Sequence, residues 1–185
     1  MARRDASLRT TAYVPRRVAE QKRVRLRGLD HHVLRWGPAS DDPIVLLHGF
    51  LDTAETWQFV VDQLPEDWPL LALDWRGFGR TDWAAGGYWF PDYYADLEAL
   101  LQQFCAQPRA RLVGHSMGGN IALAYAGIRP ERVGRVVNLE GFGLVRSDPR
   151  QAPARLARWL DEAVEQPEFN SYTGFEEFAR LLLRR

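Results

Sequence analysis

Short apolar runs alternate with amphipathic stripes along most of the chain. A continuous run such as Ile44–Leu47, bounded by turn residues, is typical of a strand that is buried on both faces. Apolar residues at helical spacing, such as Leu97, Leu100 and Leu101, indicate helices with one buried side. The alternation predicts an edge hairpin followed by parallel strands with helical crossovers, and thus a three-layer α/β sandwich. The predicted strands are 24–27, 32–36, 44–47, 70–73, 111–113 and 133–139.

Prolines limit the predicted helices. The stripes over residues 57–64 and 117–128 are each followed within two residues by a proline, which cannot continue a helix. Pro91 suits the first turn of the helix between the fourth and fifth strands. Beyond the last strand the pattern changes, because helical stripes at 156–164 and 175–182 follow without a strand. The sheet is therefore expected to end before this region.

Composition and charge exclude several classes of function. The 24 Lys and Arg residues match 24 Asp and Glu residues, so the zero net charge does not favour nucleic acid or an anionic lipid as a partner. Cys105 is the only cysteine, which excludes an internal disulfide and favours a reducing, cytoplasmic location. Apolar runs stay far below the roughly 20 residues of a membrane-spanning helix. We expect no cofactor and no metal, and the sequence does not indicate an oligomeric state.

The start of the chain departs from this charge balance. Residues 1–27 carry nine basic side chains against Asp5 and Glu20. A secretory signal needs about 7–15 apolar residues after its charges, and only Ala12–Val14 is present, so we do not expect export. An organelle transit segment is an alternative, but we interpret the region as a solvated leader before the first strand.

A G-x-S-x-G motif stands between a predicted strand and a predicted helix, with Ser116 between Gly114 and Gly118. A serine on so tight a turn adopts strained backbone angles, and side chains two residues before and after it would collide. The turn lifts the Ser116 hydroxyl above the sheet, where the helix N-terminus stabilises negative charge. A plain glycine-rich turn or a phosphate-binding loop is the alternative, but the Gly-Lys-Ser/Thr ending of such a loop is absent. The motif predicts a nucleophile.

Four motifs in order carry a family resemblance. They are His48-Gly49-Phe50, then Trp57, then the Asp-Trp-Arg-Gly-Phe-Gly-Arg-Thr-Asp stretch at 74–82, then the Ser116 motif at 114–119. Together they resemble the α/β-hydrolase fold, in the branch of serine hydrolases with a helical cap. The resemblance implies a basic arm at 1–21, the N-terminal part of the hydrolase core at 22–143 and the start of a cap at 144–185. The last region is alternatively a dimer arm.

The resemblance also implies roles for single residues. The backbone N–H groups of Phe50 and Met117 would form the oxyanion hole, and His48 with Gly49 would hold their loop in shape. Asp74 would brace the loop that follows it, as an isolated Asp at a strand end commonly does.

A serine nucleophile needs a general base, which a carboxylate orients. In this fold the order is Ser, then acid, then His, and none of the four histidines follows Ser116. Two expected strands are absent too, so we expect a near-inactive N-terminal portion whose last strand is an unpaired apolar edge. Glu140 follows the last predicted strand, where some members of the fold carry their acid. It is a candidate orienting acid or, alternatively, a loop residue that faces solvent.

Two classes of function follow. The first is a serine hydrolase that acts on a small ester, amide or other acyl substrate, with acyl transfer as a variant that the same motif would serve. The second is a non-catalytic binding module on a degenerate hydrolase scaffold. Aromatic residues in the loops expected at the carboxyl edge of the sheet predict an apolar acyl pocket, with the alternative that they pack loops onto the core. The residues predicted to line this pocket are Trp57, Trp75 and Phe142.

Overall fold

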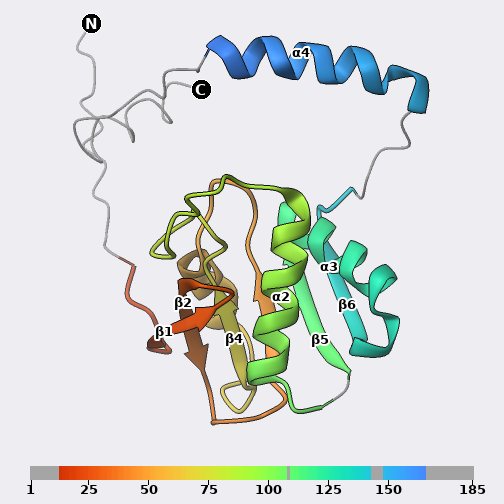
Figure 1. Ribbon diagram of the computed structural model, residues 1–185. Helices are drawn as coiled ribbons and strands as arrows, with labels where there is room; N and C mark the ends of the chain where they lie inside the picture. The colour runs from red at the N-terminus through yellow and green to blue at the C-terminus, as the bar shows by residue number, and fades with distance from the viewer. Residues whose placement is uncertain (1–12, 108, 143–147, 166–185) are drawn as a thin grey trace, which may run out of the picture. The chain divides into compact units, whose positions relative to one another are not determined.

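The computed structural model describes residues 13–107, 109–142 and 148–165 (Figure 1). The chain divides into two compact units, Met1–Leu144 and Val145–Arg185. No helix of the described ranges is long and apolar enough to cross a membrane.

A six-stranded sheet in the order β1-β2-β4-β3-β5-β6 forms the centre of the first unit. β1 pairs with β2 and β2 with β4 in antiparallel fashion, while the other three pairs are parallel. This mostly parallel sheet, with the hairpin at one edge, confirms the predicted fold class. The strands are β1 (Glu20–Leu26), β2 (Leu29–Trp36), β3 (Ile44–Leu47), β4 (Leu70–Leu73), β5 (Ala110–His115) and β6 (Val133–Leu139).

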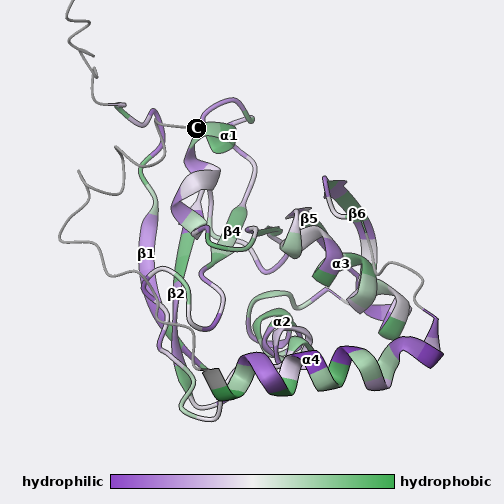
Figure 2. Cartoon of the chain, turned by 90° about the horizontal axis from the view of Figure 1, so that it is seen from above, coloured by the Kyte–Doolittle hydropathy of each residue, from purple (hydrophilic) through white to green (hydrophobic). Residues whose placement is uncertain are grey.

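Helices cover both faces of the sheet and make the expected three layers. Because side chains alternate along a strand, Leu46 of β3 packs in one apolar cluster while Val45 and Leu47 pack in the other. η1 and α1 lie over the Leu46 side, and α2 and α3 lie over the opposite side (Figure 2). These helices are η1 (Ala54–Trp57), α1 (Gln58–Val61), α2 (Phe90–Phe104) and α3 (Met117–Ile128), and the short η2 (Pro130–Arg132) follows.

The helix predicted over residues 57–64 is wrong in length. The segment is a 3-10 turn followed by a single turn of α-helix that ends at Val61. Trp57 and Val61 are buried, but Val60 is exposed and Leu64 is only partly buried. The apolar spacing arises because two successive turns pack Trp57 and Val61 against the sheet. The four apolar residues therefore do not form one continuous buried side of a helix.

The described part of the basic arm, residues 13–19, is hydrogen-bonded to the core, although most of its side chains are exposed as expected of a solvated leader. The backbone N–H groups of Arg16 and Arg17 donate to the Asp62 carboxylate at 2.8 and 3.0 Å, and the Tyr13 hydroxyl donates to it as well. The Arg17 guanidinium also donates to the carbonyl of Trp68 at 3.2 Å. The arm therefore wraps over α1 before the first strand begins.

β6 lies at the edge of the sheet and, among the described strands, pairs with β5 alone. Its Val137 and Leu139 side chains are exposed. The expectation of an apolar edge strand therefore agrees with the described part of the chain.

The second unit contains the short η3 (Pro149–Gln151) and the helix α4 (Ala152–Glu165). α4 confirms the helix predicted from the stripe at 156–164, whose apolar side chains Leu156, Trp159 and Leu160 are exposed. The second predicted stripe, at 175–182, lies outside the described residues. So does the expected boundary between residues 143 and 144, which stays a prediction.

Candidate active site

Ser116 sits on a strained turn that joins β5 to α3. Its φ of 49° and ψ of −113° lie in a region that non-glycine residues rarely adopt. A Cβ on Gly114 would come within 2.4 Å of the Gly118 carbonyl oxygen, and one on Gly118 within 2.2 Å of the Leu47 carbonyl oxygen. The turn is therefore closed by backbone contacts that only glycine permits at both positions.

Two backbone hydrogen bonds fix this turn. The Ser116 N–H donates to the Leu139 carbonyl of β6 at 2.8 Å, and the Ser116 carbonyl accepts from the Asn120 N–H at 3.0 Å. Ser116 is thus held between the neighbouring strand and the first turn of α3. The positive end of the α3 dipole lies at this residue, which favours negative charge beside its hydroxyl.

His48 connects the loop after β3 to the loop after β4. Its Nε2 accepts a hydrogen bond from the Trp75 N–H at 2.9 Å, so Nδ1 carries the proton and donates to the Gly49 carbonyl at 2.8 Å. Burial lowers the pKa of His48, although the Gly49 carbonyl and nearby carboxylates oppose this shift. Both ring nitrogens are engaged with backbone groups, so the ring is a brace in this arrangement.

The loop of Gly49 and Phe50 lies against the serine. A Cβ on Gly49 would stand 3.3 Å from the Ser116 Cβ and 3.0 Å from Nδ1 of His115. No hydrogen bond joins the Phe50 N–H to another described residue. This proximity suits the predicted oxyanion pair of Phe50 and Met117, and their role stays a prediction.

Glu140 follows β6 on a second strained turn, with a φ of 61°. The Asn138 side chain closes this turn, since its Oδ1 accepts from the Gly141 N–H at 2.9 Å. The Glu140 side chain is exposed, and its Oε2 lies 3.7 Å from Nε2 of His115. Asn138 was not among the predicted site residues, although an Asn three residues before a Gly is a recognisable turn signal.

The three predicted pocket residues lie in different environments. Trp57 lines a cavity of about 260 Å³ together with His115 and Leu139, next to the serine turn. Trp75 is fully buried, where its indole N–H donates to the His48 carbonyl at 3.1 Å, so the prediction that it lines a substrate pocket is wrong. Phe142 is exposed, and its role stays a prediction.

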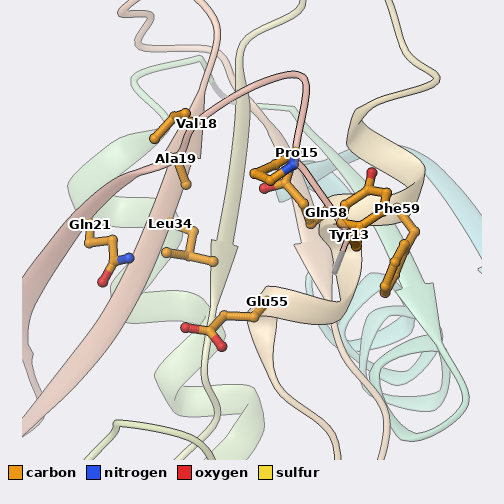
Figure 3. Close-up of a pocket in the computed structure, with 9 residues that line it drawn as sticks. All are labelled: Tyr13, Pro15, Val18, Ala19, Gln21, Leu34, Glu55, Gln58 and Phe59. Carbon is orange, nitrogen blue, oxygen red and sulfur yellow. The ribbon is translucent and has the colours of Figure 1, made fainter. Parts of the chain in front are cut away.

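A larger cavity lies away from Ser116. It has a volume of about 330 Å³ and is lined by the 13–21 segment, by Leu34 of β2 and by residues of η1 and α1 such as Glu55 and Phe59 (Figure 3). None of the predicted site residues lines it. Within the part of the chain that the structure describes, no cluster of three or more His, Cys, Asp or Glu side chains suits a metal ion.

A buried carboxylate joins the loops around the site. Asp74 accepts hydrogen bonds from the Ala54 N–H at 2.6 Å and from the Arg80 N–H at 2.9 Å, and its Oδ2 lies 2.8 Å from Nδ1 of His32. Asp74 was expected to brace a loop, but His32 was not predicted as its partner. No local pattern connects Asp74, which follows β4, with His32 of β2, 42 residues earlier.

Comparison with known proteins agrees with this geometry. A profile described as the alpha/beta hydrolase fold matches residues 42–182. The chain belongs to this family.

Curated relatives include serine hydrolases and a lipase. A serine hydrolase-like protein of Danio rerio is 31% identical over 132 residues, which cover 70% of this chain and 40% of the relative. Lipase LipV of Mycobacterium tuberculosis is 34% identical over 112 residues, which cover 60% of this chain and 42% of the lipase. The chain thus spans less than half the length of these two relatives.

Solved structures share the fold. A hypothetical protein from Pseudomonas aeruginosa PAO1 superposes with a TM-score of 0.79 at 28% identity, covering 89% of this chain and 59% of that protein. The epoxide hydrolase VrEH1 of Vigna radiata superposes with a TM-score of 0.63 at 25% identity, covering 77% of this chain and 46% of that enzyme.

Proposed function

We propose that the chain is the nucleophile-bearing part of a serine hydrolase, in which Ser116 attacks an ester or related acyl substrate and forms an acyl-enzyme. The observation that carries the proposal is the strained Ser116 turn between Gly114 and Gly118. Such strain persists only where the surrounding structure imposes it, and it is typical of functional sites. The serine hydrolases and the lipase among the relatives support the same class of reaction.

The proposed mechanism uses the groups around Ser116 in turn. The hydroxyl attacks the acyl carbon while its proton passes to a general base, and the carbonyl oxygen gains negative charge. The N–H groups of Phe50 and Met117 would donate to that oxygen, with the α3 N-terminus adding to the stabilisation. Collapse of the tetrahedral intermediate expels the leaving group, which takes the proton from the base. The same base then activates a water that attacks the acyl-enzyme, which releases the acid and returns the proton to Ser116.

Glu140 is proposed as the carboxylate that orients the general base. Glu140 follows β6, the strand that neighbours β5 and its Ser116 turn. The Ser116 N–H donates to the Leu139 carbonyl at 2.8 Å, which holds the two turns together. The exposed carboxylate faces His115 at 3.7 Å, which leaves it accessible to an imidazole from another segment.

The general base is not identified among the four histidines. Both nitrogens of His48 bond to backbone groups, and His31 and His32 are buried in β2. Among the described residues His115 approaches Glu140 at 3.7 Å but forms no hydrogen bond with the Ser116 hydroxyl. We therefore expect these 185 residues to react slowly on their own. Loss of the base from a serine triad lowers kcat by a factor on the order of 10⁶.

A fluorophosphonate probe tests the nucleophile. Ser116 should be labelled in a form of the protein that turns over an ester, and labelling should be lost in Ser116→Ala. Ser40→Ala is a matched control, because Ser40 lies in the turn before β3 and should leave labelling unchanged. Equal labelling of the Ser116→Ala variant and the parent would refute the assignment.

A non-catalytic binding module is the second candidate. The same experiment separates the two, since a module should not react covalently in any form. Reading the coding DNA past the codon for Arg185 gives an independent measurement. A frame that supplies further strands and a histidine supports the hydrolase, and unrelated sequence behind a stop codon supports the module.

A further inference from the structure

The segment after Asp82 exposes aromatic rings and carries no charge. Residues 83–91 contain no Asp, Glu, Lys or Arg. Trp83 is 80% exposed and Trp89 is 73% exposed, and Tyr88 and Phe90 are partly exposed beside them. Contiguous exposed apolar surface of this kind marks a site of interaction. We call residues 83–90 the aromatic loop.

The loop has a defined conformation. The Tyr88 ring fills the space beside Gly77, where a Cβ would approach within 2.5 Å of the ring. The Tyr88 hydroxyl accepts from the Ala84 N–H at 3.1 Å, and the Gly87 N–H donates to the Ala84 carbonyl at 3.3 Å. Tyr88 therefore fastens the loop to the core, while Trp83 and Trp89 stay in solvent.

The loop lies at the same edge of the sheet as the proposed nucleophile. β3, β4 and β5 are parallel, so their carboxyl ends share one edge. The aromatic loop follows β4 and Ser116 follows β5, so both lie at that edge. A partner that binds the loop would therefore face the end of the sheet that carries Ser116.

Arg23 of β1 and Arg27 of the turn after β1 border the loop at its two ends. The Arg23 guanidinium pairs with Asp82 at 2.8 Å and donates to the Arg80 carbonyl at 2.9 Å. Arg27 pairs with Asp92 at 3.0 Å. The two carboxylates that flank the loop are thus neutralised and do not repel an anionic group. The guanidinium groups themselves remain partly exposed.

We propose that the aromatic loop docks the protein on a phospholipid surface. Tryptophan and tyrosine rings are favoured at the boundary between headgroups and acyl chains, and neighbouring guanidinium groups suit the phosphates. The docking does not depend on catalysis. Only its consequence rests on the proposed function, namely that Ser116 meets acyl esters dissolved in the lipid.

Vesicle binding tests the proposal with the full chain. Vesicles of phosphatidylcholine, alone and mixed with phosphatidylglycerol, are sedimented with the protein, and brominated lipids report tryptophan insertion by quenching. In the Trp83→Ser/Trp89→Ser variant, the partition coefficient onto vesicles should fall at least about tenfold, and the quenching by brominated lipids should be lost. Ser116→Ala should bind as the parent does, which separates failure of docking from failure of the proposed function.

Two matched tryptophan variants control for composition. Trp68 is 42% exposed and precedes β4 at the opposite edge of the sheet, and Trp159 lies on α4. Trp68→Ser and Trp159→Ser should each keep binding within about twofold of the parent. The proposal is overturned if the parent does not bind vesicles, if the double variant binds equally well, or if Trp159→Ser removes the binding. It is also overturned if the parent is a dimer, the double variant is a monomer and the two bind vesicles equally, because the loop would then be a contact between two copies of the chain.

Discussion

The backbone N–H of Ser116 donates to the carbonyl of Leu139 at 2.8 Å, which links the turn of the proposed nucleophile to that of the proposed acid. Ser116 has a φ of 49°, and Glu140, which follows Leu139, has a φ of 61°. Both residues are strained and stand at neighbouring strand ends. The geometry of the site therefore depends on the packing of β5 against β6 and on the glycines that allow it.

Gly118→Ala should disrupt the serine turn, whereas Gly127→Ala in the same helix should not. A Cβ on Gly118 would stand 2.2 Å from the Leu47 carbonyl oxygen, and one on Gly127 would meet nothing within 4 Å. We expect Gly118→Ala to lose several kcal/mol of stability in urea unfolding or to lose probe labelling. Gly127→Ala should gain roughly 0.5–1 kcal/mol from helix propensity. Equal effects of the two substitutions would contradict the close packing of the turn.

Glu140→Gln should reduce turnover far more than Glu131→Gln. Loss of the orienting carboxylate of a triad lowers kcat by about 10⁴. Glu131 lies in η2 before β6, is exposed and serves as a matched control at the other end of that strand. The measurement is kcat on a chromogenic ester, in a form of the protein that hydrolyses it. A loss below tenfold in Glu140→Gln would mean that another residue is the acid.

The buried pair of Asp96 and Arg76 should contribute to stability above about pH 4. Burial alone would raise the pKa of Asp96, but the hydrogen bonds from Arg76, with His31 close by, outweigh this effect and hold the pKa at about 2. Because the folded pKa is the lower one, this stabilisation is lost as the pH falls from about 4 toward 2. Asp96→Asn should cost about 3–5 kcal/mol at neutral pH, since Arg76 stays buried.

An exposed pair provides the control for that measurement. Glu55 and Arg80 lie 2.9 Å apart with both side chains about half exposed, so Glu55→Gln should cost less than about 1 kcal/mol. Urea unfolding between pH 2 and pH 7 measures both variants. If Asp96→Asn and the parent differ equally at pH 2 and pH 7, the pH dependence is refuted.

Cys105 should resist thiol reagents in the folded protein. Burial raises the pKa of its thiol to about 11, with nearby Asp42 adding to the shift. At pH 8 only about a thousandth of this thiol is ionised, and the thiolate is the reactive form. A disulfide reagent should label the native chain at least about 100-fold more slowly than the urea-unfolded chain. Similar rates in both states would show that Cys105 is accessible.

Several elements of the fold were predictable because local signals agreed. The runs at 44–47, 70–73 and 133–139 match β3, β4 and β6 residue for residue, since turn residues bound each run on both sides. The need for glycine at position 114 likewise reflects a contact close in sequence, with the Gly118 carbonyl. The stripe over 57–64 failed because apolar spacing does not distinguish a helix from two consecutive turns.

Long-range partners were not predictable. The prediction for Trp75 was wrong because its burial depends on His48, 27 residues earlier. The attachment of the basic arm was not predicted, because charge alone does not reveal that Asp62 accepts the N–H groups of Arg16 and Arg17. Pairings of this kind arise from the packing of distant segments, and a single sequence holds no local trace of them.

The hydrogen bonds around Asp74 close a small ring of chain that ends at Thr81. The Thr81 hydroxyl donates to the Asp74 carbonyl at 2.7 Å, and the Arg80 N–H donates to the Asp74 carboxylate at 2.9 Å. The residues from Trp83 to Phe90 emerge beyond that ring. Replacement of the exposed Trp83 and Trp89 is thus a modular change, so directed evolution can vary these two positions while Tyr88 keeps the loop attached and the chemistry beneath remains intact.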